Sequence, residues 1–150
     1  MLYVLAPFIG WLVSGTIKFM INYVQFGKEA RKKIGNGGFP STHTTVMVTT
    51  ISLIGLNEGF SNPIFGLGIA VTFIIIIDAT GLRRAVGKHA TAINLLVNDH
   101  ATAEEKETLR ESMGHTKWEI LGGIVLGVLV GLLLHLLSPI VSGLLSLGGN

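Results

Sequence analysis

Long stretches without formal charge limit this chain more than any other feature of its sequence. Leu2–Phe26 holds one charged residue, Lys18, in 25 positions, and Ile120–Leu147 holds none in 28. Both runs exceed the roughly 20 apolar residues that a helix needs to cross a bilayer. Two shorter uncharged runs, Ser41–Leu56 and Pro63–Ile77, lie between them. The pattern therefore predicts an all-α integral membrane helical bundle with about four membrane segments.

The composition excludes the main alternatives to a membrane protein. Charged residues make up 13% of the chain, about half of the roughly one quarter that soluble domains carry. Hydrophobic residues make up 49%, which excludes a disordered chain. Because cysteine is absent, disulfides, thiolate metal sites and cysteine nucleophiles are excluded as well. The length of 150 residues fits a single domain over residues 1–150.

Three features modify the simple layout of four segments. Ser41–Leu56 is short and rich in threonine, so we expect the middle pair of segments to be tilted or to span incompletely. Pro139 predicts a break of the last segment after Ser138. The polar stretch Thr80–Lys117 predicts a helical insertion before the last segment, with a surface helix over Glu104–Met113.

The cations predict how the segments are oriented. Ten of the 11 lysines and arginines lie in two loops, which a four-segment hairpin arrangement places on one face; the other is Lys18. The positive-inside rule makes that face cytoplasmic and puts both termini outside. We therefore expect a multi-pass protein of the cell membrane. The ten residues are Lys28, Arg31, Lys32, Lys33, Arg83, Arg84, Lys88, Lys106, Arg110 and Lys117.

A glycine-rich segment from Gly35 to His43 is the first candidate site. Pro40 suits the entrance of a helix, and Ser41 or Thr42 can cap it. Exposed backbone N–H groups at such a helix start, including that of Gly38, attract an oxyanion. His43, one residue inside the helix, is placed to donate a proton to a leaving group. The same residues also fit a plain capped helix beside a loop.

The second candidate site is His115 with Glu119. A spacing of four residues places both side chains on one helical face, and a carboxylate on one imidazole nitrogen leaves the other free to attack. Alternatively, Glu119 is the capping-box partner of Thr116 at the start of the last helix. The geometry allows both roles.

Cations next to the third segment form the third candidate site. Arg83, Arg84 and Lys88 follow that segment closely, in a stretch that we expect to continue its helix into water as far as Asn98. Arginine's planar fork suits phosphate oxygens; contact with anionic lipid headgroups is the alternative. Lys18 is a further candidate, because an intramembrane lysine is usually functional unless it snorkels to the surface.

Three glycines in the last segment recur at every fourth position. Gly123, Gly127 and Gly131 would let another helix approach closely. Packing within the protomer and a homodimer through this face both fit the pattern.

These motifs, taken in order, resemble a known superfamily. Pro40-Ser-Thr-His43 resembles the Pro-Ser-Gly-His signature of the type 2 phosphatidic acid phosphatases, a superfamily that includes the vanadium-dependent haloperoxidases. His115-x-x-x-Glu119 resembles their His-x-x-x-Asp signature. The longer strings around both motifs, with Asp78-Ala-Thr-Gly-Leu-Arg-Arg-Ala-Val-Gly-Lys88 between them, resemble a divergent bacterial and plant branch of that superfamily.

The resemblance implies a mechanism without a metal or other cofactor. It implies that His115 attacks phosphorus, that Glu119 orients it, and that His43 protonates the leaving oxygen. Lysine, arginine and backbone amides would hold the phosphate. The superfamily's Lys-x6-Arg-Pro motif and the Ser-Arg pair before its nucleophile are absent here, and Arg83, Arg84 and Lys88 are expected to replace those ligands.

The sequence therefore predicts a metal-independent membrane phosphatase. We expect it to hydrolyse a lipid phosphate or diphosphate through a phosphohistidine at the cytoplasmic membrane surface. The alternative is an inactive protein that binds or transports lipid phosphates, while a small structural or channel-like protein would not explain three ordered motifs. Nucleic acid is not an expected partner, because the cations lack interleaved aromatic residues.

Overall fold

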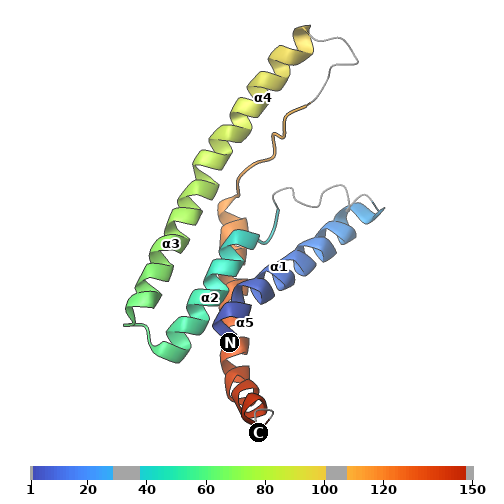
Figure 1. Ribbon diagram of the computed structural model, residues 1–150. Coiled ribbons are helices and arrows are strands. Elements are labelled where there is room, and N and C mark those ends of the chain that lie inside the picture. Colours follow the sequence, from blue (N-terminus) through green and yellow to red (C-terminus); the bar gives the residue numbers. More distant parts are fainter. Residues whose placement is uncertain (1, 29–37, 101–107, 148–150) are drawn as a thin grey trace.

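Every regular element in the described part of the chain is a helix, as the apolar runs predict. The computed structural model describes residues 2–28, 38–100 and 108–147. The elements are α1 (Leu2–Phe26), α2 (Thr42–Glu58), α3 (Pro63–Thr80), α4 (Leu82–His100) and α5 (Lys117–Leu147). Figure 1 shows α2 in the middle of the bundle, with α1, α3 and α5 around it.

Three helical stretches, rather than four, are long and apolar enough to cross a membrane: Leu2–Phe26, Pro63–Val97 and Lys117–Val141. The predicted segment Ser41–Leu56 does form a helix, but α2 has only 17 residues. Three of its seven buried residues are threonines and a fourth is glycine, and such small side chains allow neighbouring helices to come close. α2 is thus the interior of the bundle, and three of the about four predicted membrane segments are long and apolar enough to span by themselves.

Small residues determine how α1 and α5 pack on α2. Ala6, Gly10 and Ser14 are the buried residues of α1, and a Cβ on Gly10 would lie 3.3 Å from the backbone of Val46. On α5, a Cβ on Gly127 would lie 2.9 Å from the carbonyl oxygen of Thr45.

A Cβ on Gly123 would lie 2.7 Å from the carbonyl oxygen of Ser41, the N-cap of α2, and a Cβ on Gly131 would lie 2.9 Å from that of Thr49. The face that these glycines form with Gly127 is therefore taken up by helix packing within the protomer.

The last helix does not break at Pro139, contrary to the prediction, and α5 continues to Leu147. Proline has no N–H to donate to the carbonyl four residues earlier. The Ser138 hydroxyl donates to that carbonyl, on His135, at 2.7 Å. This bond satisfies the carbonyl, so the helix can pass through the proline.

α4 continues α3 almost in line beyond Gly81 (Figure 1), as the polar continuation of the third segment predicts. The predicted surface helix over Glu104–Met113 is wrong for residues 108–113, which are not helical; its first part lies outside the described residues. Asn94 of α4 replaces the helical hydrogen bonds there. Its amide donates to the Leu109 carbonyl at 2.8 Å and its oxygen accepts the Leu109 N–H at 2.8 Å.

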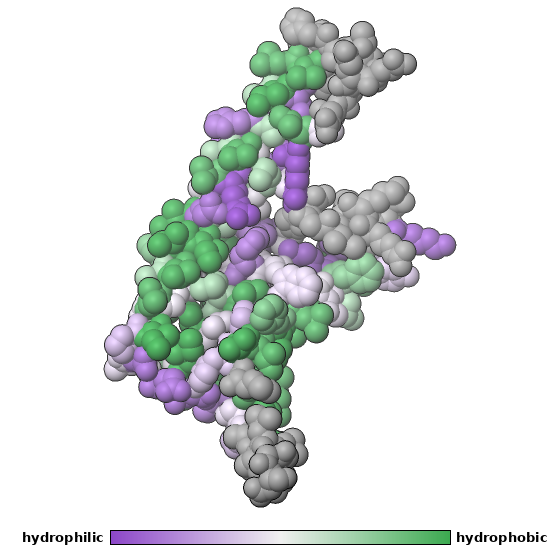
Figure 2. Space-filling view, viewed as in Figure 1, coloured by the Kyte–Doolittle hydropathy of each residue, from purple (hydrophilic) through white to green (hydrophobic). Residues whose placement is uncertain are grey.

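Figure 2 shows apolar side chains over most of the visible face of α3, between hydrophilic zones at the α2–α3 turn and near the start of α4. The end of α1, the starts of α2 and α5 and the junction of α3 with α4 all lie toward this second zone (Figure 1). We call it the cationic end of the bundle, since it includes Lys28, Arg83, Arg84, Lys88 and Arg110.

Candidate active site

The start of α2 is fixed by hydrogen bonds to its own first turn and to α5. Ser41 is the N-cap of α2, and its hydroxyl accepts from the Thr44 N–H at 3.4 Å and the Thr44 hydroxyl at 2.9 Å. The Ser41 N–H donates to the Glu119 carbonyl at 2.8 Å. Ser41 is fully buried, so it positions the helix and does not face open space.

One carboxylate fulfils both roles that the sequence allows for Glu119. Its Oε2 lies 3.1 Å from Nδ1 of His115 and accepts the Thr116 N–H at 2.8 Å. The Thr116 hydroxyl in turn accepts the Glu119 N–H at 3.3 Å, completing a capping box at the start of α5. A carboxylate at Nδ1 favours the proton on that nitrogen and leaves the lone pair of Nε2 for attack.

The backbone of His115 is tied to the end of α3. Its N–H donates to the Ala79 carbonyl at 3.0 Å. Gly114, directly before it, has φ +84°, and a Cβ there would lie 2.7 Å from the Ala79 oxygen and 3.1 Å from the Arg84 nitrogen. Only glycine combines this conformation with such a close approach. The nucleophile candidate is therefore held by α3 and α5 together.

His43 faces His115 across a short gap. Their ring centroids are 6.2 Å apart and the ring planes are inclined by 59°. One phosphoryl group can reach both rings at this separation. His43 comes from the first turn of α2 and is exposed, whereas His115 is buried apart from 9% of its surface.

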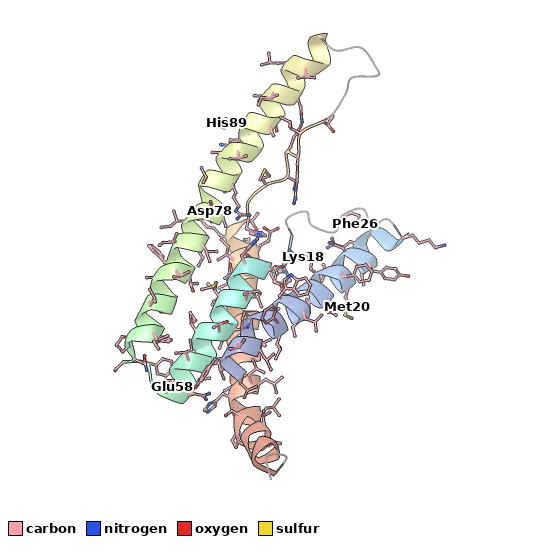
Figure 3. All side chains as sticks on the ribbon, in the orientation of Figure 1. Lys18, Met20, Phe26, Glu58, Asp78 and His89 are labelled. Carbon is pink, nitrogen blue, oxygen red and sulfur yellow. The ribbon has the colours of Figure 1, made fainter. Side chains whose placement is uncertain are left out.

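Both histidines line a cavity of about 720 Å³, within the roughly 300–1,000 Å³ typical of ligand sites. Of the predicted binding residues, Lys18, Thr42 and Arg83 line it. Figure 3 shows Lys18 on the side of α1 toward the start of α2. The Thr42 hydroxyl accepts a hydrogen bond from Ser14 at 3.1 Å.

Four other predicted binding residues, the buried Ser41 among them, do not line this cavity. Arg84 and Lys88 are exposed on other faces of α4, and Gly38 lies outside the lining as well. The rotation of α4 turns Arg84 and Lys88 away from the histidines, and Arg83 alone of these three cations lines the cavity. The expectation that all three cations of α4 surround one phosphate is thus not met by the geometry.

Two further charged residues belong to the surroundings of the site: Arg110, whose membership the sequence leaves open, and Asp78, which holds Arg83 from outside the cavity lining. Arg110 lines the cavity from the segment that packs along α4. Its signal in the sequence is its position five residues before His115. Asp78, in the last turn of α3, accepts a hydrogen bond from Nε of Arg83 at 2.5 Å and so holds this guanidinium. Arg31 lies outside the described residues.

The cavity is electropositive. Lys18, Arg83 and Arg110 line it. The pKa of His115 is lowered mainly by burial, against the opposing effect of Glu119. The pKa of His43 is lowered by partial desolvation and then by Arg83, so both rings are neutral at pH 7. In the part of the chain that the structure describes, no group of three or more His, Cys, Asp or Glu residues is arranged to hold a metal ion.

Similarity to known proteins covers this site. The sequence model of a family described as "Divergent PAP2 family" matches residues 2–130, which include every residue named above for the cavity. The chain is also 32% identical over 104 residues to the "Uncharacterized membrane protein YuiD" of Bacillus subtilis (strain 168). The match covers 61% of this chain and 66% of that protein, so the chain spans just under two thirds of its relative. No solved structure matches the chain.

Proposed function

Because the chain belongs to the Divergent PAP2 family, we propose that this membrane protein is a phosphatase for a lipid phosphate or diphosphate. The observation that carries the proposal is the arrangement of His115, its carboxylate Glu119 and the opposing His43 in one cationic cavity. A nucleophile, a carboxylate that orients it and a second proton-transfer group together can carry out phosphoryl transfer through a histidine.

The first step forms a phosphohistidine. Nε2 of His115 attacks phosphorus, the bond from phosphorus to the lipid oxygen breaks, and His43 gives that oxygen a proton as the alcohol departs. The ring of His115 becomes cationic, and Glu119 at Nδ1 stabilises this charge. Since Arg83 helps to lower the pKa of His43, a bound phosphate that neutralises the cations raises that pKa and supplies the acid form.

The second step regenerates the protein. Water attacks phosphorus while neutral His43 accepts its proton, and the bond between phosphorus and Nε2 of His115 breaks with its electron pair returning to nitrogen. Phosphate then leaves. Arg83, Arg110 and Lys18 stabilise the charge of the transferring phosphoryl group, the dominant contribution in reactions of this kind.

We place the reaction at the cytoplasmic surface of the cell membrane. The support is that the cavity lies at the cationic end of the bundle, which the positive-inside rule assigns to the cytoplasm. α1 carries exposed apolar residues up to the level of the cavity, so a lipid phosphate can reach it from the bilayer.

The test is phosphate release from prenyl phosphates, phosphatidic acid and phosphatidylglycerophosphate by purified protein, with His115→Ala as the matched control. The proposal predicts release by the wild type with at least one lipid and none by the variant. A phosphoenzyme that is stable to base should be trapped in the wild type alone. Binding of these lipids without any release would instead favour a binding or transport protein.

A further inference from the structure

The cavity continues away from the histidines along an apolar side of α1. Trp11 and Leu12 line its lower part and are 62% and 61% exposed. Trp11 also lines a second hollow, of about 420 Å³, together with Pro7, Phe8 and Val46. Trp11 is common to both hollows, so they lie next to each other along α1. We call them together the α1 groove: Pro7, Phe8, Trp11, Leu12, Gly15, Phe19 and Val46.

Gly15 keeps this groove open. It lines the cavity one helical turn from Trp11 and one from Phe19. A Cβ on Gly15 would meet no atom within 4 Å, in contrast to Gly127 and Gly131 of α5, which are pressed against α2. Close helix packing therefore does not require glycine at position 15, and the absence of a side chain there leaves the groove open.

The groove has the length and polarity of one lipid chain in one leaflet. From Lys18 to Pro7, eleven residues rise roughly 16 Å along the helix, about half of the ~30 Å hydrocarbon core. Its upper end holds Lys18 and the two histidines, and its lower end is apolar.

We propose that the α1 groove holds one apolar chain of the lipid phosphate, while its phosphate lies between His43 and His115. The position of the phosphate rests on the proposed function. The chain enters sideways from the bilayer, because Trp11 and Leu12 are exposed there. Transfer of a chain from lipid to an apolar groove gains little free energy. The groove therefore acts through its shape and its position beside the histidines, and the substrate class is a lipid phosphate with at least one apolar chain.

Trp11 offers a direct probe of chain binding. The polypeptide has two tryptophans. Trp118→Phe, at an exposed position, makes Trp11 the single tryptophan. A single-chain alkyl phosphate with two bromines at mid-chain, in an unbrominated detergent, should quench its fluorescence. The unbrominated alkyl phosphate of equal length should reverse the quenching, and the matching alcohol should do so much less. Quenching that neither competitor reverses would overturn the proposal.

A blocking variant supplies the second readout. The Cβ of Gly15→Leu meets no atom within 4 Å, and its side chain should occupy the groove. We expect it to weaken binding of the bromoalkyl phosphate by about 5- to 150-fold, the usual effect of overfilling an occupied space. Orthovanadate, which has no chain, should bind as in the wild type by calorimetry. Gly66→Leu on α3 is the matched control, because Gly66 is equally open and lies outside the cavity.

The two proposals fail separately in these experiments. If Gly15→Leu and Gly66→Leu bind the bromoalkyl phosphate equally well, the groove is refuted even when the protein releases phosphate. If competed quenching occurs and no lipid phosphate is hydrolysed, the groove stands and the phosphatase does not.

Discussion

Replacing Glu119 by glutamine separates charge from geometry at the site. In the wild type one oxygen of Glu119 accepts from both Thr116 N–H and Nδ1 of His115. Because a backbone N–H can only donate, Thr116 obliges the glutamine to place its oxygen in the same position. His115 then keeps its tautomer and orientation in Glu119→Gln, and only the negative charge is lost.

The size of the effect follows from that difference. A hydrogen bond to a charged partner is worth about 1.5–3 kcal/mol and a neutral one about 0.5–1.5 kcal/mol. Loss of the charge should therefore reduce kcat roughly 5- to 15-fold by destabilising the cationic phosphohistidine. Glu119→Ala, which also removes the orientation, should lose about 10²- to 10⁴-fold.

A pH profile distinguishes this effect from simple damage to the fold. The acid limb of kcat/KM reports protonation of the free nucleophile. Burial lowers the pKa of His115 while Glu119 raises it. Activity should thus persist to a pH below the ordinary value of about 6.5 for histidine, and in Glu119→Gln the acid limb should move lower still.

Thr116→Ala is the matched control, since it removes the other half of the capping box and leaves the carboxylate on His115. It should cost about 0.5–2 kcal/mol of stability and leave both kcat and the acid limb unchanged in folded protein. Equal losses of kcat in Thr116→Ala and Glu119→Gln would refute the orienting role, as would an unchanged acid limb in the glutamine variant.

Three further predictions follow from the described geometry. His43→Ala should lose about 10²- to 10⁴-fold on an alkyl phosphate and much less on a nitrophenyl phosphate, whose leaving group needs no proton; equal losses on both would exclude the general acid. Single cysteines in this cysteine-free chain, Lys28→Cys and Ser61→Cys, should react with an impermeant thiol reagent from opposite sides of the membrane, and labelling from one side contradicts the orientation. Gly127→Ala should lower thermal stability in detergent by about 1–3 kcal/mol, because its Cβ would lie 2.9 Å from an α2 carbonyl. Gly66→Ala, in open space, should instead raise the stability by about 0.4–1 kcal/mol. Equal shifts in the two variants would contradict the tight packing of α2 on α5.

The sequence determines those features that depend on residues close together in the chain. The apolar runs predict the helices because a helix in lipid must satisfy its own backbone. The pairing of His115 with Glu119 follows from a spacing of four residues and a capping box. The helix start at Thr42, with Ser41 as its cap, is equally local.

The tertiary structure decides which of these residues share one space. Arg83 reaches the cavity and Arg84 and Lys88 do not, because successive residues of a helix point in different directions and only packing sets the rotation of α4. Arg110 lines it from a non-helical segment, in which Asn94 of α4 holds the neighbouring Leu109, 15 residues further along the chain.

α2 illustrates the same distinction on the scale of a whole helix. Its threonine-rich sequence is typical of a weak membrane segment. Close contacts with the small residues of α1 and α5 nevertheless place it at the centre of the bundle. Sequence periodicity describes each helix alone, whereas burial depends on the neighbours that the complete chain brings to it. For that reason the contact of His115 with Glu119 could be predicted from the sequence, whereas which of the candidate cations share the cavity, and the groove beside it, could not.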